Sequence, residues 1–93
     1  MIYMLVYETP PDDLEGTLAE HWENRWYRLS DTVAFVQESN GSVNTNAITV
    51  AEKVGMTLEG RQVGAVFPIR GLWGGFHNKE LWEWLHNAES NGG

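Results

Sequence analysis

The sequence contains no cysteine, which excludes a disulfide framework and any metal site built on thiolates. Its longest apolar runs are far shorter than the about 20 residues that a membrane-spanning helix needs, so we expect no membrane association. No basic region precedes the first apolar stretch, and nothing there predicts a signal peptide. These absences favour a cytoplasmic protein.

Basic residues are also few, since six Lys and Arg stand against 13 Asp and Glu and give a formal net charge of −7. A general nucleic-acid binder needs a basic stripe to neutralise phosphates, so a nucleic-acid partner is not expected. The excess of acid is typical of a soluble domain, and it leaves room for a protein partner.

The chain does carry enough apolar material for one core, because 42% of its 93 residues are apolar and five are Trp. We therefore expect a single ferredoxin-like domain over residues 1–93, with an ordered core over 1–89 and a frayed end over 90–93. A domain of this size gains further apolar burial by pairing with a second copy.

The first part of the chain predicts a central strand followed by a helix. Residues Ile2–Tyr7 have apolar side chains at both parities, so both faces of this strand should be covered. Two prolines end the strand. A helix is expected over residues 11–24, with Asp12 and Asp13 at its positive end.

The middle of the chain predicts one or two further strands and a second helix. Residues 26–37 read either as one long bent strand or as a hairpin with a minimal turn at Ser30-Asp31, and their odd positions make the more apolar face. The second helix is capped by Asn44 or Thr45 and ends at Gly55. Its apolar stripe consists of Ala47, Ile48, Ala51 and Val54.

The last part predicts an edge strand and a short helix. Residues 62–69 alternate cleanly, and Pro68 places the end of this strand at the edge of a sheet. A glycine-rich turn follows at 71–76, and a helix is expected over 77–89. Its buried side comprises Leu81, Trp82, Leu85 and Ala88.

This order of elements predicts an α+β, ferredoxin-like fold. The βαβ(β)αβ sheet carries both long helices on one face, and a short C-terminal helix follows. The other face is apolar on several strands, and a second subunit is the usual way to cover such a face. We therefore expect a homodimer.

Four segments carry a family likeness, namely VYET, PPDDLEGTLAEHW, WYRLSDTVAFVQES and VGAVFPIRGLWGG. In this order they resemble the small ferredoxin-like, endoribonuclease-like family around the CRISPR-associated adaptation subunit, and especially its uncharacterised relatives. The likeness covers most of the chain up to about Phe76. It implies that Glu8 stands where the nuclease members carry the Asp proposed to bind metal, one from each protomer. The basic and aromatic signature of their second strand is not matched here.

Glu8, Asp12 and Asp13 form an acidic corner after the first strand and are the candidate catalytic residues. Glu8 is also the candidate metal ligand, because Mg²⁺ binds few carboxylates and keeps several waters. The simpler interpretation is that Asp12 and Asp13 complement a helix N-terminus while Glu8 is solvated. Under this simpler interpretation we expect no catalytic residue, no metal and no cofactor.

The candidate partner-binding residues are aromatic: Trp73, Phe76, Trp82 and Trp84. Core packing and a protein interface explain them better than base stacking, because the basic residues that should accompany stacked bases are sparse. Trp82 and Trp84 are two positions apart and cannot both face one side of a helix, so one of them should be exposed or covered by a partner.

The sequence thus favours a small acidic homodimeric module that binds or assembles proteins and has no catalysis of its own. Two alternatives stay open. The resemblance implies a Mg²⁺-dependent nuclease of the CRISPR-associated adaptation-subunit type. A dimeric ferredoxin-like enzyme would instead bind a small molecule in a Trp- and His-lined space between sheet and helices.

Overall fold

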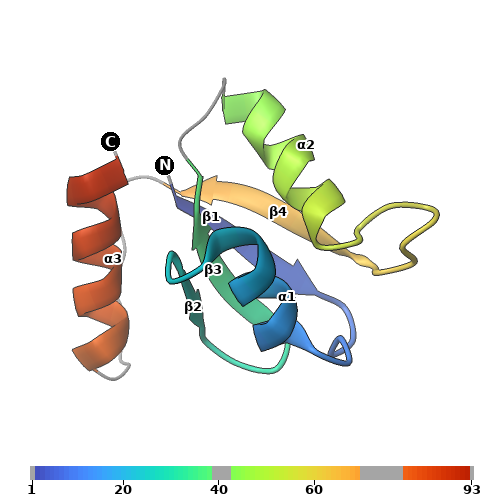
Figure 1. Ribbon diagram of the computed structural model, residues 1–93, viewed down its shortest axis with the longest axis horizontal. Helices are drawn as coiled ribbons and strands as arrows, with labels where there is room; N and C mark the ends of the chain where they lie inside the picture. The colour runs from blue at the N-terminus through green and yellow to red at the C-terminus, as the bar shows by residue number, and fades with distance from the viewer. Residues whose placement is uncertain (1, 39–42, 70–78, 93) are drawn as a thin grey trace.

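A computed structural model gives the fold and describes residues 2–38, 43–69 and 79–92. The predicted α+β class is confirmed (Figure 1). In chain order the elements are β1 (Ile2–Tyr7), α1 (Leu14–Trp22), β2 (Trp26–Arg28), β3 (Val33–Gln37), α2 (Val43–Lys53), β4 (Gly64–Ile69) and α3 (Lys79–Gly92). None of the helices in the described ranges has the length and apolar character needed to cross a membrane.

The four strands form one sheet in the order β2-β3-β1-β4, and each neighbouring pair is antiparallel. Strands β1 and β2, which α1 connects, lie on either side of β3. Strands β3 and β4, which α2 connects, lie on either side of β1. This is the ferredoxin-like arrangement, and it confirms the expected central place of β1.

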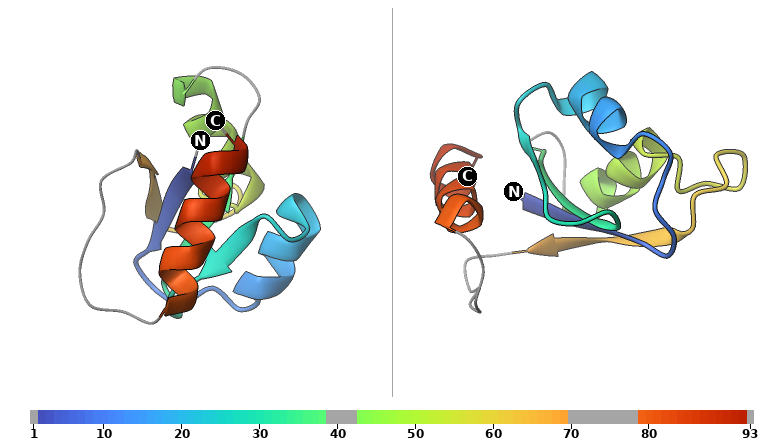
Figure 2. Two further views of the ribbon diagram at one scale, coloured as in Figure 1. Left: turned by 90° about the vertical axis from the view of Figure 1, so that its left-hand side faces the viewer. Right: turned by 90° about the horizontal axis from the view of Figure 1, so that it is seen from below.

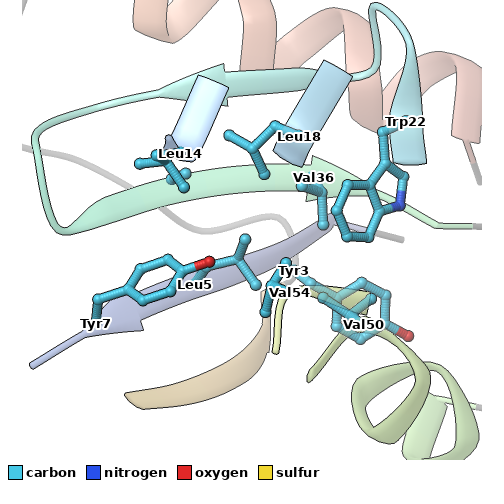
Figure 3. Packing of buried hydrophobic residues seen from close by; sticks show 10 residues of the cluster. Tyr3, Leu5, Tyr7, Leu14, Leu18, Trp22, Val36, Val50 and Val54 are labelled. Atoms are coloured by element: carbon cyan, nitrogen blue, oxygen red, sulfur yellow. The ribbon is translucent and has the colours of Figure 1, made fainter. Parts of the chain in front are cut away.

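One face of the sheet is covered by α1 and α2 (Figure 2). Apolar residues at alternating positions of β1 and β3 point toward these helices, because successive side chains of a strand point to opposite faces. Figure 3 shows this packing from close by. The buried cluster consists of Tyr3, Leu5, Tyr7, Leu14, Leu18, Trp22, Ala34, Val36, Val50 and Val54.

The opposite face carries a second cluster, in which Ile2 and Phe35 of the sheet meet α3. Of the predicted buried side of that helix, Leu81, Leu85 and Ala88 are buried, whereas Trp82 is only half-buried. The face that we expected a second subunit to cover is therefore covered in part by α3 of the same chain. Both faces of β1 are covered, as predicted, but Met4 and Val6 on the α3 side are only half-buried.

Helix α1 is shorter than predicted, spanning Leu14–Trp22 where 11–24 was expected. Asp13 has non-helical dihedral angles (φ −140°, ψ 72°), and its carboxylate accepts a hydrogen bond from the backbone N–H of Gly16 at 3.1 Å. Asp13 is thus the N-cap and the helix starts after it. At the other end Glu23 adopts φ 55°, and the helix ends at Trp22, two residues before the predicted end.

Residues 26–37 form the hairpin and not the long strand. The hydroxyl oxygen of Ser30 accepts a hydrogen bond from the backbone N–H of Val33 at 3.1 Å, and this contact shapes the turn. Both faces of the hairpin are packed, because Ala34 and Val36 at even positions are fully buried under α1 and α2. At odd positions Tyr27, Leu29 and Phe35 belong to the cluster under α3.

Helix α2 begins at Val43, so Asn44 and Thr45 lie within it and neither is its cap. The predicted stripe is rotated, because Ile48 is 63% exposed while Val50 is fully buried. Gly55 stops the helix as expected, with φ 80°.

Two further expectations concern the end of the chain. Helix α3 continues to Gly92, beyond the expected end at residue 89 and through the segment that was expected to fray. The glycine-rich turn at 71–76 and the start of the terminal helix at 77–78 lie outside the described residues.

Candidate functional site

The two aspartates of the acidic corner line a surface pocket of about 300 Å³ beside the first turn of α1. It brings Asp12 and Asp13 together with charged residues that the sequence did not connect to them. The lining residues are Pro10, Pro11, Asp12, Asp13, Leu14, Glu15, Arg28 and Asp31.

Arg28 occupies the centre of this charge cluster. Its guanidinium donates to Glu15 at 3.1 Å and also to Asp31, so it links α1 to the turn of the hairpin. The hydrogen bonds to Glu15 and Asp31 raise the pKa of Arg28 above its ordinary value, and the charges of both carboxylates add to them. Two of the four carboxylates around the pocket are thus already paired.

The structure separates Glu8 from the two aspartates. Glu8 follows β1, is exposed, and its backbone N–H donates to the carbonyl of Val63 at 2.8 Å. It does not line the acidic pocket. Within the described ranges no group of three or more His, Asp or Glu side chains is placed to hold a metal ion. The described part of one chain therefore supplies no ligand set around Glu8.

A buried carboxylate that the sequence did not single out lies in the same layer, at the opposite end of α1. Glu38, directly after β3, is 5% exposed. Its Oε2 accepts hydrogen bonds from the indole Nε1 of Trp22 at 2.9 Å and from Nζ of Lys53 at 3.0 Å. These three side chains join the ends of α1, β3 and α2.

The electrostatics of this cluster favour the charged carboxylate. Burial alone would raise the pKa of Glu38, but the hydrogen bonds from Lys53 and Trp22 and the charges of Lys53 and Arg25 lower it below its ordinary value. The ammonium group of Lys53 also lies 5.4 Å from the centre of the Trp22 ring, within the range of a cation–π interaction. Glu38 is thus an anion at neutral pH with its partners in place.

Two of the aromatic candidates for partner binding lie on α3. Trp84 is half-buried and packs against Tyr27 and Phe35, with ring centres 6.2 and 6.4 Å away. Trp82 is also half-buried and packs beside the same cluster. Neither indole is fully exposed. Trp73 and Phe76 lie outside the described residues.

Part of the sheet's second face stays open beside α3. Val63 is 62% exposed and Phe67 is 48% exposed, and Ala65 between them is also exposed. The register places Ala65 and Phe67 opposite Val6 and Met4, on the face that α3 partly covers. We call Val63, Ala65 and Phe67 the β4 strip.

The space between the sheet and α1 and α2, where the alternative of a small-molecule enzyme places its site, is filled by the buried cluster (Figure 3). The ring of His21 lies edge-on to the ring of Trp22, with the two ring centres 5.7 Å apart. His86 lies exposed on α3. The described histidines and tryptophans therefore do not line a common interior pocket.

No protein-family model matches the chain, and no curated protein and no solved structure is significantly similar to it.

Proposed function

We propose that the chain is a small module that associates with a second copy of itself through the β4 strip and assembles proteins without catalysis of its own. The observation that carries this proposal is the exposure of large apolar side chains, Val63 and Phe67, beside a helix that covers only part of the same face. Contiguous exposed apolar surface on a soluble domain marks an interaction site.

The shape of this face suits a two-fold partner. Helix α3 packs on one part of the sheet, apart from the start of β4 (Figure 2), and the residues of the β4 strip are exposed. Under a two-fold axis the α3 of each copy meets the bare strip of the other, which is the self-complementarity that a closed dimer requires. Trp82, half-buried on α3, is then at the edge of the contact.

The β4 strip offers an uncharged surface for contact, while α3 beside it exposes Glu80 and Glu83. Two chains with a formal charge of −7 each repel one another, so a stable contact must avoid the acidic surface. The side chains of the β4 strip carry no charge, whereas the opposite layer carries the acidic pocket beside α1.

Pairing edge to edge through β4 is disfavoured by Pro68. The backbone N–H of Glu8 donates to the carbonyl of Val63, so these two residues form a hydrogen-bonded pair of β1 and β4. In an antiparallel ladder, hydrogen-bonded pairs alternate with pairs that exchange no backbone hydrogen bonds. Pro68, opposite Tyr3, falls in a non-bonded pair, so its nitrogen faces the free edge. Proline has no N–H, and an added strand would lose a donor there.

Light scattering after size-exclusion chromatography tests this proposal. We expect a dimer at micromolar concentration and a monomer for Phe67→Lys, because a lysine in the strip brings a charge into the contact. Ile48→Lys is the matched control, since Ile48 is 63% exposed on α2, on the other layer, and its substitution should leave the dimer intact. A wild-type monomer, or equal effects of both variants, would overturn the proposal.

A Mg²⁺-dependent nuclease is the second candidate, and the position of Glu8 favours it. Glu8 continues the register of β1 opposite Val63, so it belongs to the same face as the β4 strip. A face-to-face dimer would bring two such carboxylates toward one interface, where a divalent cation relieves their repulsion. Cleavage of RNA or DNA that requires Mg²⁺ or Mn²⁺ and is lost in Glu8→Ala would establish this activity, and no cleavage by the wild type would remove it.

A further inference from the structure

A second surface pocket, of about 250 Å³, lies where three segments distant in sequence meet. The connection from α1 to β2 supplies one wall, the end of β3 another, and α3 the third. The lining residues are Asn24, Arg25, Gln37, Trp84, Asn87 and Ala88. Neither the acidic corner nor the β4 strip shares a residue with this pocket.

The walls of the pocket are fixed by contacts of their own. The side-chain amide of Gln37 donates to the carbonyl of Ala88 at 3.1 Å and ties β3 to α3. The backbone N–H of Gln37 donates to the carbonyl of Arg25 at 3.0 Å. The backbone N–H of Arg25 in turn donates to the carbonyl of Trp22 at 2.8 Å. Trp84 is held by its packing on the sheet. A site whose walls are already in place binds without a large ordering cost.

Arg25 supplies a positive charge to this pocket. Its guanidinium makes no hydrogen bond or ion pair with any residue of the described ranges. The acidic group that senses its charge, Glu38, is already paired with Lys53 at 3.0 Å. The five N–H donors of Arg25 are therefore available to an anion from solution, and a guanidinium suits a phosphate or a carboxylate.

The other groups favour a planar ring with polar edges. Each carboxamide of Asn24 and Asn87 offers both a donor and an acceptor, and Gln37 keeps its carbonyl oxygen as an acceptor because its amide is engaged. Such groups match the edges of a nucleobase, and an indole offers it a stacking surface. The volume is below the about 300–1,000 Å³ of a drug-sized site, so one ring system with a short anionic arm fits.

We propose that this pocket binds a single nucleotide unit, with its base between Trp84 and the carboxamides and its phosphate on Arg25. The proposal does not depend on self-association, because every lining residue comes from one chain. A free mononucleotide is the favoured source, since the net charge of −7 repels a polyanionic strand.

Titrating ¹⁵N-labelled protein with AMP, GMP, CMP and UMP in turn, followed by NMR, tests the site. We expect the side-chain N–H signals of Trp84, Asn87 and Arg25 to shift together for at least one of them, with a Kd on the order of 0.1 mM for a ligand of this size. Arg25→Gln should weaken binding by about tenfold or more, because it removes a charged donor. Arg61→Gln removes the same charge from an exposed residue outside the pocket and should leave Kd unchanged.

Asn87→Ala probes the base rather than the phosphate. Asn87 is exposed on α3, where alanine is a better helix former, so this variant should stay folded and bind several-fold more weakly. Ribose 5-phosphate and inorganic phosphate, titrated in parallel, should bind at least tenfold more weakly than the best nucleotide.

Three results would overturn the proposal. The first is the absence of coordinated shifts at millimolar nucleotide. The second is equal binding of inorganic phosphate, which would leave an anion site without base recognition. The third is an equal loss in Arg25→Gln and Arg61→Gln. A short single-stranded oligonucleotide that binds tenfold more tightly than any mononucleotide would contradict the free nucleotide as the source.

Discussion

The carboxylate of Glu38, directly after β3, accepts a hydrogen bond of 3.0 Å from the ammonium group of Lys53, the last residue of α2. The same oxygen accepts the indole N–H of Trp22, the last residue of α1. The C-terminal ends of α1 and α2 are thus both hydrogen-bonded to the residue that directly follows β3. Glu38 is buried, whereas Lys53 keeps about a third of its side chain exposed, at 32%.

Glu38→Gln tests the contribution of this contact to stability and to its pH dependence. Because the fold lowers the pKa of Glu38, its contribution is present above the unfolded-state pKa of about 4.3 and is lost as pH falls through the lower folded-state value. The substitution should reduce the free energy of unfolding at pH 7 by about 1–2 kcal/mol, since Lys53 is only partly buried. Urea denaturation at pH 7 and at pH 3 measures both effects.

The matched control is Glu52→Gln, which removes an exposed carboxylate from the same helix as Lys53. It should change the free energy of unfolding by less than about 0.5 kcal/mol. If Glu38→Gln and Glu52→Gln behave alike at both pH values, the buried pair does not stabilise the fold.

Asp13→Ala tests the assignment of the acidic corner to a helix cap. It removes the acceptor of the Gly16 N–H and should lower the free energy of unfolding by about 0.5–2 kcal/mol. Asp12→Ala, one residue earlier and exposed, should have an effect within about 0.5 kcal/mol. A larger loss in Asp12→Ala than in Asp13→Ala would contradict the assignment.

Gly16→Ala gives a second test of the same cap. In an ordinary helix interior this change adds about 1 kcal/mol of stability. Here a Cβ at position 16 would overlap the carboxylate of Asp13, so that carboxylate must move and its hydrogen bond is lost. We therefore expect no net gain in the melting temperature. In Asp13→Ala as background, where nothing is left to displace, the same glycine substitution should be stabilising.

Ionisation of the buried Tyr7 at alkaline pH should lower the free energy of unfolding. Burial raises the pKa of Tyr7 to about 12, above its ordinary value near 10. A raised folded-state pKa contributes stability that is complete below about pH 10 and is lost as pH rises through about 12. Tyr7→Phe should remove this part of the alkaline destabilisation. Stability curves between pH 8 and pH 11 for both proteins measure it, and parallel curves would contradict it.

The order of the elements could be predicted from the sequence because each carries a local signal. Apolar residues at both parities marked β1 as central, Pro68 marked an edge, and Gly55 marked a helix end. Helix boundaries were less accurate. The first helix begins two residues after Asp12. The reason is that Asp13 caps the helix: its side chain accepts a backbone N–H of the first turn, and its own dihedral angles are not helical.

The location of α3 could not be predicted in the same way. The spacing of Leu81, Leu85 and Ala88 gives an apolar stripe, but a stripe does not say which surface it covers. An apolar sheet face can be covered either by a second subunit or by a helix of the same chain. Here α3 covers part of this face.

The candidate sites depend even more on contacts between distant residues. Glu38 is followed in the sequence by polar residues, a pattern typical of a solvated position, yet its partners are 16 positions before it and 15 positions after it. Arg25 and Trp84 come together in one pocket although they are far apart in the chain. No periodicity in the sequence encodes such pairs.

The absence of cysteine allows the most direct test of self-association through the β4 strip, because an introduced thiol is the only one in the chain. Ala65→Cys places it in the strip, and Ala19→Cys places it on the exposed side of α1. With a short bis-maleimide at micromolar protein, we predict a covalent dimer for Ala65→Cys and almost none for Ala19→Cys. No dimer for Ala65→Cys, or equal yields from both variants, would contradict the proposed interface.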